Sequence, residues 1–259
     1  MMRLFLALIA LVFAAAPAAA LDPFQAAGID RKPDAQVPWD MPFQDQVGRS
    51  VTLGALAQGK PLLLVPVQHQ CPNICGITLA GLLQAIAGQR LRPGRDFSLV
   101  AFGIDPREKP AAATGDLRRL LGQFPAFPRD AIHGLTGKAA DVAAVTQAIG
   151  YRYAWDPLLE QYDHVAATAV VSPRGRLTRW LYGIAPDPED IALAVTEAGQ
   201  GKVGTWTDQL LLLCYHYDPV TGRYSAAIWT GLRVFAALTL VALLGVIGHA
   251  AYRGRRSRP

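Results

Sequence analysis

Two cysteines carry the clearest chemistry in this sequence. Cys71 and Cys75 stand where a short apolar run ends and a helical pattern begins. Residues at positions i and i+4 share a face of a helical turn, so both sulfurs can point at one spot, and a helix N-terminus favours the thiolate. Two converging thiolates suit Cu(I) or zinc, and the same pair can close into a disulfide and exchange electrons. A purely structural disulfide is the third interpretation, but so short a loop stabilises a fold little.

A tightly held metal needs a further ligand, and one histidine is placed to supply it. Asp163 and His164 directly precede a predicted strand over 165–172. His164 is therefore either a metal ligand or a polar surface residue at a strand entrance, and Asp163 can orient its imidazole through a hydrogen bond. We interpret His69, which lies just before Cys71, as an exposed loop histidine, with an auxiliary ligand as the alternative.

Apolar runs and helical spacing predict the elements that position these residues. Buried strands are expected over 61–67 and 97–104, helices over 76–87, 110–121, 138–149 and 188–198, a short strand at 151–155, a hairpin of 165–172 with 177–182 across a turn at 173–176, and a small hairpin over 43–53 with Gly48 near its turn. This order predicts an α/β domain with a mixed sheet. It is similar to a thioredoxin-like fold with an inserted helical segment, in which the loop into the hairpin approaches the cysteine turn.

Both ends of the chain have the patterns of membrane-directed segments. Residues 1–20 combine Arg3, an apolar run and small residues, which is the layout of a secretory signal peptide; an uncleaved anchor is the alternative. Residues 226–252 hold Arg233 as their only formal charge and predict a transmembrane helix; the alternative, a buried core helix, lacks following chain to cover it. The four arginines of 253–259 predict a cytoplasmic tail.

The net charge of +5 belongs to these ends and not to the domain between them. Removing Arg3 and the four tail arginines leaves 25 − 5 = 20 basic residues against 20 acidic ones. A neutral domain lacks the basic surface that nucleic-acid binding requires, so no nucleic-acid partner is expected. We expect an exported domain that is tethered to the membrane at its C-terminus.

Together these motifs resemble the SCO/SenC family of copper-binding cytochrome c oxidase assembly factors. The similar pieces are the CPNIC run from Cys71 to Cys75, Asp105 followed by Pro106, a Gly-Leu-Thr-Gly turn at 134–137, and Asp163 and His164 followed by a strand and a turn ending at Gly175. The pieces occur in the family's order over roughly 43–183.

The resemblance implies a fold, a site and a role. It implies a thioredoxin-like three-layer domain with a mixed central sheet, to which the C-terminal transmembrane helix is added. It also implies one copper ion bound by Cys71, Cys75 and His164. Asp105 and Asp163 are expected to lie behind these ligands, where they shape the site and orient His164 without binding the metal. For Asp105 an equally good interpretation is a turn or capping aspartate before Pro106.

The implied role is a copper chaperone without turnover, which assists assembly of the dinuclear copper centre of cytochrome c oxidase subunit II. The alternative is a thiol–disulfide oxidoreductase that keeps the cysteines of that centre reduced through Cys71 and Cys75. Further expected partners are another periplasmic copper chaperone or a thiol reductant. The expected location is the bacterial inner membrane, with the domain in the periplasm and the C-terminus in the cytoplasm.

Two features depart from the family pattern. Typical members have an N-terminal anchor, whereas this chain is expected to run as a signal peptide (1–20), an extended lead-in (21–42), the domain (43–200), a pre-membrane segment (201–225), a transmembrane helix (226–252) and a tail (253–259). Cys214 and His216 in the pre-membrane segment form either a second soft-ligand or resolving-thiol site or part of a packed apolar segment.

Overall fold

A seven-stranded mixed sheet forms the centre of the domain. The computed structural model describes residues 26–71, 75–201, 217–218, 223–224, 235–240, 243 and 245. The sheet order is β11-β10-β4-β5-β6-β2-β3. The strands are β2 (Phe43–Asp45), β3 (Ser50–Val51), β4 (Leu62–Val67), β5 (Ser98–Gly103), β6 (Ile132–Thr136), β10 (Ala167–Val171) and β11 (Leu177–Tyr182). Strands β4, β5 and β6 are parallel, β10 and β2 pair antiparallel with the outer two of them, and β11 and β3 pair antiparallel with β10 and β2, so the predicted mixed α/β sheet is confirmed.

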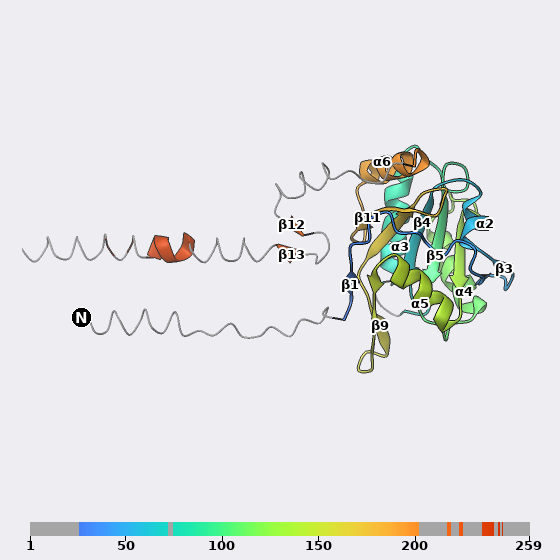
Figure 1. The fold of residues 1–259 in the computed structure, drawn as a ribbon, viewed down its shortest axis with the longest axis horizontal. Coiled ribbons are helices and arrows are strands. Elements are labelled where there is room, and N and C mark those ends of the chain that lie inside the picture. Colours follow the sequence, from blue (N-terminus) through green and yellow to red (C-terminus); the bar gives the residue numbers. More distant parts are fainter. Residues whose placement is uncertain are drawn as a thin grey trace, which may run out of the picture.

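Helices cover both faces of this sheet (Figure 1). They are α2 (Leu53–Ala57), α3 (Cys75–Ala87), α4 (Pro110–Gln123), α5 (Ala139–Ala148) and α6 (Pro188–Gly199). Successive residues of β4 point to opposite faces, so Leu63 and Val65 join a first core with α3, α4 and α6, whereas Leu62 and Leu64 join a second core with α2 and α5. The continuous apolar run of β4 is therefore explained by burial on two sides.

The four helices predicted within 76–198 and the main hairpins are found within a few residues of their expected bounds. The turn of the β2–β3 hairpin contains Gly48 at a positive φ of 82°. The expected turn at 134–137 is wrong, because Gly134 to Thr136 lie in β6, a central parallel strand that the sequence pattern did not indicate. Gly134 is needed there for close packing, since a Cβ on it would lie 3.0 Å from the Cβ of Ala113 in α4.

Within residues 26–201, two further strand pairs lie outside the main sheet. The expected strand at 151–155 is divided into β7 (Tyr151–Arg152) and β8 (Ala154–Asp156). Strand β8 pairs with β9 (Gln161–Asp163), and this hairpin projects from the lower edge of the domain in Figure 1. Strand β7 pairs with β1 (Gly28–Ile29), so the extended lead-in is attached to the domain.

The predictions for the chain ends fall largely outside the described residues. These are the signal peptide 1–20, Cys214 and His216, and the tail 253–259. Within the predicted membrane segment, 235–240, 243 and 245 are described and helical. No helix in the described part of the chain is both long and apolar enough to span a bilayer. Strands β12 (Tyr217–Asp218) and β13 (Arg223–Tyr224) form a short antiparallel pair.

Two helical glycines should respond in opposite ways to replacement by alanine. A Cβ on Gly81 of α3 would lie 2.5 Å from the carbonyl oxygen of Ile184, whereas a Cβ on Gly115 of α4 meets nothing within 4 Å. We expect Gly81→Ala to lower the free energy of unfolding by about 1–3 kcal/mol through overpacking. Gly115→Ala should raise it by about 0.5–1 kcal/mol, because alanine has the higher helix propensity. Urea denaturation of the full chain measures both changes, and equal signs would contradict this account of α3 packing.

Candidate metal centre

The cysteine turn begins directly after the central strand β4. Residues 68–71 follow Val67, and the Cys71 N–H donates to the Gln68 carbonyl at 3.1 Å. Cys71 is half-buried and packs against the first core. Cys75 is the first residue of α3, and its side chain lies outside the described part of the structure. The predicted strand-to-helix junction is thus found, with the two cysteines at either end of it.

The pairing of β4 with β10 brings the segment that carries His164 to this turn. Leu62 lies opposite Val171 and Leu64 opposite Ala169 in an antiparallel register. Because strands β4 and β10 run in opposite directions, continuing their register beyond Val67 places His164 level with the residues that follow Val67. A hydrogen bond of 3.1 Å from the Tyr162 N–H to Gln68 Oε1 joins the two segments.

The ring of His164 is oriented by a buried tyrosine. The Tyr151 hydroxyl donates to the Val165 carbonyl at 2.7 Å, and its oxygen lies 2.9 Å from His164 Nδ1. A phenol has one hydrogen, so the second contact is satisfied when Nδ1–H donates to the tyrosine oxygen. This tautomer leaves the lone pair on Nε2, the nitrogen that can then bind a metal.

The surroundings of His164 also favour the neutral ring. Burial lowers the pKa of His164, while the hydrogen bond to Val165 and the charge of Asp163 act in the opposite direction. A neutral imidazole is the form that ligates metals. Tyr151 itself is 2% exposed and stacks on Trp180 with 5.7 Å between ring centroids, so its hydroxyl is held firmly.

The two aspartates expected near the site have different surroundings. Asp163 is the last residue of β9, and its negative charge acts on His164. The hydrogen-bond partner of His164 Nδ1 on a side chain is Tyr151 and not Asp163. Asp105 follows β5 and is buried, and its two oxygens accept from the backbone N–H, Nε and Nη2 of Arg107 at 2.7–2.9 Å. Burial raises the pKa of Asp105, but these bonds outweigh burial and hold it below its ordinary value. Asp105 therefore has the hydrogen bonds expected of a turn aspartate before Pro106.

Arg107 connects that turn to the β8–β9 hairpin. Its guanidinium carbon lies 3.9 Å from the centroid of the Trp155 ring and 5.7 Å from that of Tyr162. A guanidinium over aromatic faces is attractive, so the contact supports the hairpin whose end leads to His164. Arg107 was missed in the sequence, because its nearer partner in the chain, Trp155, is separated from it by two helices and two strands.

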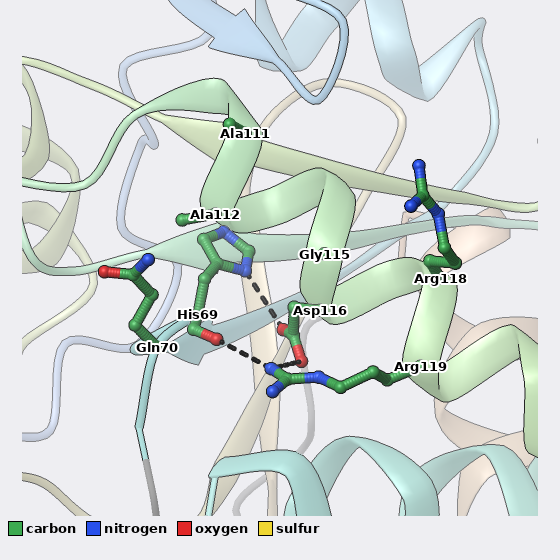
Figure 2. Close-up of a pocket in the computed structure, with 8 residues that line it drawn as sticks. All are labelled: His69, Gln70, Ala111, Ala112, Gly115, Asp116, Arg118 and Arg119. Atoms are coloured by element: carbon green, nitrogen blue, oxygen red, sulfur yellow. Dashed lines mark hydrogen bonds and ion pairs between the residues drawn. The ribbon is translucent and has the colours of Figure 1, made fainter.

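His69 differs from both of its predicted roles. It is 1% exposed, so the exposed loop histidine is wrong. Its Nδ1 lies 3.1 Å from Asp116 Oδ2 and its Nε2 lies 3.0 Å from the Leu135 carbonyl, which commits both nitrogens to the protein and leaves neither as an auxiliary ligand. Figure 2 shows the ring facing Asp116 across the pocket. Gly103 makes room for it, since a Cβ there would lie 3.2 Å from the ring.

A buried glutamate supports the same turn and was also missed. Glu108 is 8% exposed, and its Oε1 accepts from the Gln70 N–H at 2.7 Å. Its Oε2 is buried without a hydrogen-bond partner among the residues that the structure describes. Burial is the largest influence on this carboxyl and raises the pKa of Glu108. The buried strand followed by Asp105-Pro-Arg-Glu was the signal that could have identified it.

The ligand set of Cys71, Cys75 and His164 stays a prediction. Within the described residues, no three His, Cys, Asp or Glu side chains converge as a metal-binding group. The side chain of Cys75 is not among those residues.

Comparison with known proteins identifies the relatives of this domain. The SCO1/SenC family model matches residues 30–199. A putative electron transfer protein from Aquifex aeolicus VF5 has 23% identity and a TM-score of 0.57, over 66% of this chain and 96% of the other. Arabidopsis thaliana ScoI with copper bound has 21% identity and a TM-score of 0.51, over 66% and 99%. No curated protein matches the chain.

A third solved structure is BsSco, described as a member of the Sco family of cytochrome c oxidase assembly proteins with a disulfide switch. It has 22% identity and a TM-score of 0.50, over 67% of this chain and 99% of the other. At such identities the structural likeness establishes a shared fold, and the predicted thioredoxin-like arrangement of the domain is consistent with it.

The role of Tyr151 can be tested on the protein without metal. We expect the wild-type His164 ring to be the Nδ1–H tautomer, and Tyr151→Phe to give a measurable Nε2–H population, because Nδ1–H then loses the 2.9 Å bond to the tyrosine oxygen and the Val165 carbonyl is farther away, at 3.3 Å. Long-range ¹H–¹⁵N correlation spectra of the imidazole at pH 7.5 measure this. Tyr153→Phe, which removes a hydroxyl from a neighbouring half-buried ring, is the control. Identical His164 nitrogen shifts in wild type and Tyr151→Phe would refute the assignment.

Glu108 should make stability depend on pH with a defined sign. Because its folded pKa is raised, its contribution is fully present below the unfolded value and is lost as pH rises through the folded value. Glu108→Gln keeps the acceptor for Gln70 and removes the buried charge. We expect the variant to be more stable than wild type at pH 7 by about 1 kcal/mol, and the gap to close towards pH 4.

Urea denaturation at several pH values measures this gap. The exposed Glu160 supplies the matched control, Glu160→Gln. A gap that widens as the pH falls would contradict the assignment.

Proposed function

The chain belongs to the SCO1/SenC family, and on this premise we propose that it carries one copper ion held by Cys71, Cys75 and His164. The observation that carries the proposal is the hydrogen bond between His164 Nδ1 and Tyr151, which favours a lone pair on Nε2 in a residue that the continued β4–β10 register brings level with the cysteine turn. Two thiolates and a neutral imidazole form a soft donor set that suits copper. Copper is the cargo here and not a reagent for turnover.

We propose that the cargo is delivered to the dinuclear copper centre of cytochrome c oxidase subunit II. Support comes from two relatives of the same fold, a plant ScoI with copper bound and BsSco of the oxidase assembly proteins. Transfer then proceeds by ligand exchange, in which incoming thiolates replace the ligands of this chain. Another periplasmic copper chaperone or a thiol reductant is the proposed partner for loading or reduction.

The proposed location is the periplasmic side of a bacterial inner membrane. The signal-peptide pattern at 1–20, the apolar segment at 226–252 and the arginine-rich tail after it support a periplasmic domain with a single C-terminal helix through the membrane.

A thiol–disulfide oxidoreductase is the second candidate function. Cys75 is the first residue of α3, where thiolates are stabilised, and the relative BsSco is described with a disulfide switch. This function requires both cysteines and does not require His164. Cys214 and His216 have no part in either proposal.

Copper stoichiometry on the full chain tests the ligand set. We expect the reduced wild type to bind copper near one per chain, and His164→Ala to bind at least about tenfold more weakly, since loss even of an outer-shell partner costs that much. His133→Asn is the matched control, because His133 is a half-buried histidine of β6, away from the cysteine turn. Unchanged binding by His164→Ala would exclude this ligand set.

The two candidate functions give different patterns in cells that depend on the protein for oxidase assembly. A copper chaperone loses function on replacement of Cys71, Cys75 or His164. An oxidoreductase loses function on replacement of either cysteine and keeps it in His164→Ala. Measured oxidase activity in these strains therefore separates delivery of copper from reduction of its receiving cysteines.

A further inference from the structure

Two open hollows lie beside Cys71, along helices α3 and α4. One has a volume of about 530 Å³ and is lined by Cys71 together with residues of α3, α4 and Ile184. The other has a volume of about 460 Å³ and lies along α4 (Figure 2). They share His69, Asp116 and Arg119 as lining residues, so they form one continuous surface feature, which we call the α3–α4 groove.

Part of this groove is apolar and exposed. Ile77 of α3 is 56% exposed, and Ile184 is 41% exposed, although both are large aliphatic side chains. Leu120 of α4 and Phe124, which directly follows that helix, line the same hollow. Exposed apolar side chains next to a reactive sulfur are suited to contact with another polypeptide.

The rest of the groove carries unbalanced positive charge. Arg118 and Arg119 of α4 line it, and the carboxylate beside them, Asp116, also lies 3.1 Å from His69 Nδ1 through its Oδ2. One carboxylate cannot balance two guanidinium groups, so the lining keeps a net positive charge.

No other carboxylate balances these arginines within the groove. Among its described lining residues, Asp116 is the single acidic one, and it lies 3.6 Å from Arg119. The remaining polar side chains of the Cys71 hollow are amides, Gln68, Gln84 and Gln123. Arg118 and Arg119 are both exposed, so their charges face whatever enters the groove.

We propose that the α3–α4 groove receives an extended acidic segment of a partner protein, which presents a cysteine to Cys71. Carboxylates of the segment pair with Arg118 and Arg119, and an apolar side chain contacts Ile77 and Ile184. The inference rests on the proposed function, because it assumes that Cys71 exchanges with incoming thiols. It adds the chemical class of the partner and the side from which that partner approaches.

The test measures how fast Cys71 reacts with charged peptides. A Cys75→Ser, Cys214→Ser background leaves Cys71 as the single thiol, since the chain has 3 cysteines. The probes are three five-residue peptides, each with one cysteine flanked by two glutamates, two glutamines or two lysines, and activated as the 2-pyridyl disulfide. The Cys71 thiolate attacks the peptide sulfur, a Cys71–peptide disulfide forms, the bond to the pyridyl sulfur breaks, and that sulfur leaves as pyridine-2-thione after taking a proton.

At low salt we expect the glutamate peptide to react about threefold to tenfold faster than the glutamine peptide, and the lysine peptide to react more slowly than both. The differences should disappear in 1 M salt, where charges are screened within about 3 Å. Arg119→Gln and Arg118→Gln should each reduce the preference for glutamate while the glutamine peptide reacts at the wild-type rate. Arg118 has no bond to the described residues of the cysteine turn, so its variant separates the effect of charge from any change in that part of the turn.

Arg174→Gln is the matched control, because it removes an exposed arginine from the turn between β10 and β11, at the far end of the sheet from His164. Equal rates for the three peptides, a preference that survives 1 M salt, or a preference kept by both α4 variants would overturn the groove proposal. Copper binding by the wild type and reaction with the glutamine peptide would then leave the proposed function intact. Loss of both would overturn the proposed function, and the groove proposal with it.

Discussion

The antiparallel pairing of β4 with β10 is the constraint on which the candidate site depends. A slip of one residue would exchange the two faces of β10. Val170 would leave the core under α3, α4 and α6, while its neighbours Ala169 and Val171 would leave the core under α2 and α5. Because both faces are fully buried, the register is fixed by packing on two sides. The height of His164 relative to the cysteine turn is therefore set by apolar residues that carry no chemistry themselves.

The state of the His164 ring depends on chain that precedes the expected domain. Its partner Tyr151 belongs to β7, and β7 pairs with β1 at Gly28–Ile29. Ile29 is 1% exposed and packs in the second core near Tyr151. The lead-in expected as a simple extended linker thus supports the tyrosine that selects the imidazole tautomer. A boundary placed at residue 43 removes β1 from the unit that forms the site.

Elements with a clear local sequence pattern were predictable, whereas features that depend on contacts between distant residues were not. Strands β4 and β5 were predictable because each is a continuous apolar run between turn residues. Strand β6 was not, because its IHGLT sequence holds a histidine and a glycine whose use becomes evident only against α4. His69 was wrongly predicted to be exposed for the same reason, since its partner Asp116 is 47 residues away and no local sequence pattern indicates their contact. Cys71 and His164 were identifiable because their residue types are rare and chemically specific.

His164 and His69 are held by different partners. His164 is held through Tyr151, which packs in the second core. His69 faces α4, which covers the first core, and both of its ring nitrogens are committed to Asp116 and the Leu135 carbonyl. Asp116 is the single carboxylate among the described lining residues of the groove, so Arg118 and Arg119 leave that lining with a net positive charge. An acidic partner drawn to those arginines would therefore reach Cys71 along α4, on the side of His69, and not through the Tyr151 contacts that orient the proposed ligand His164.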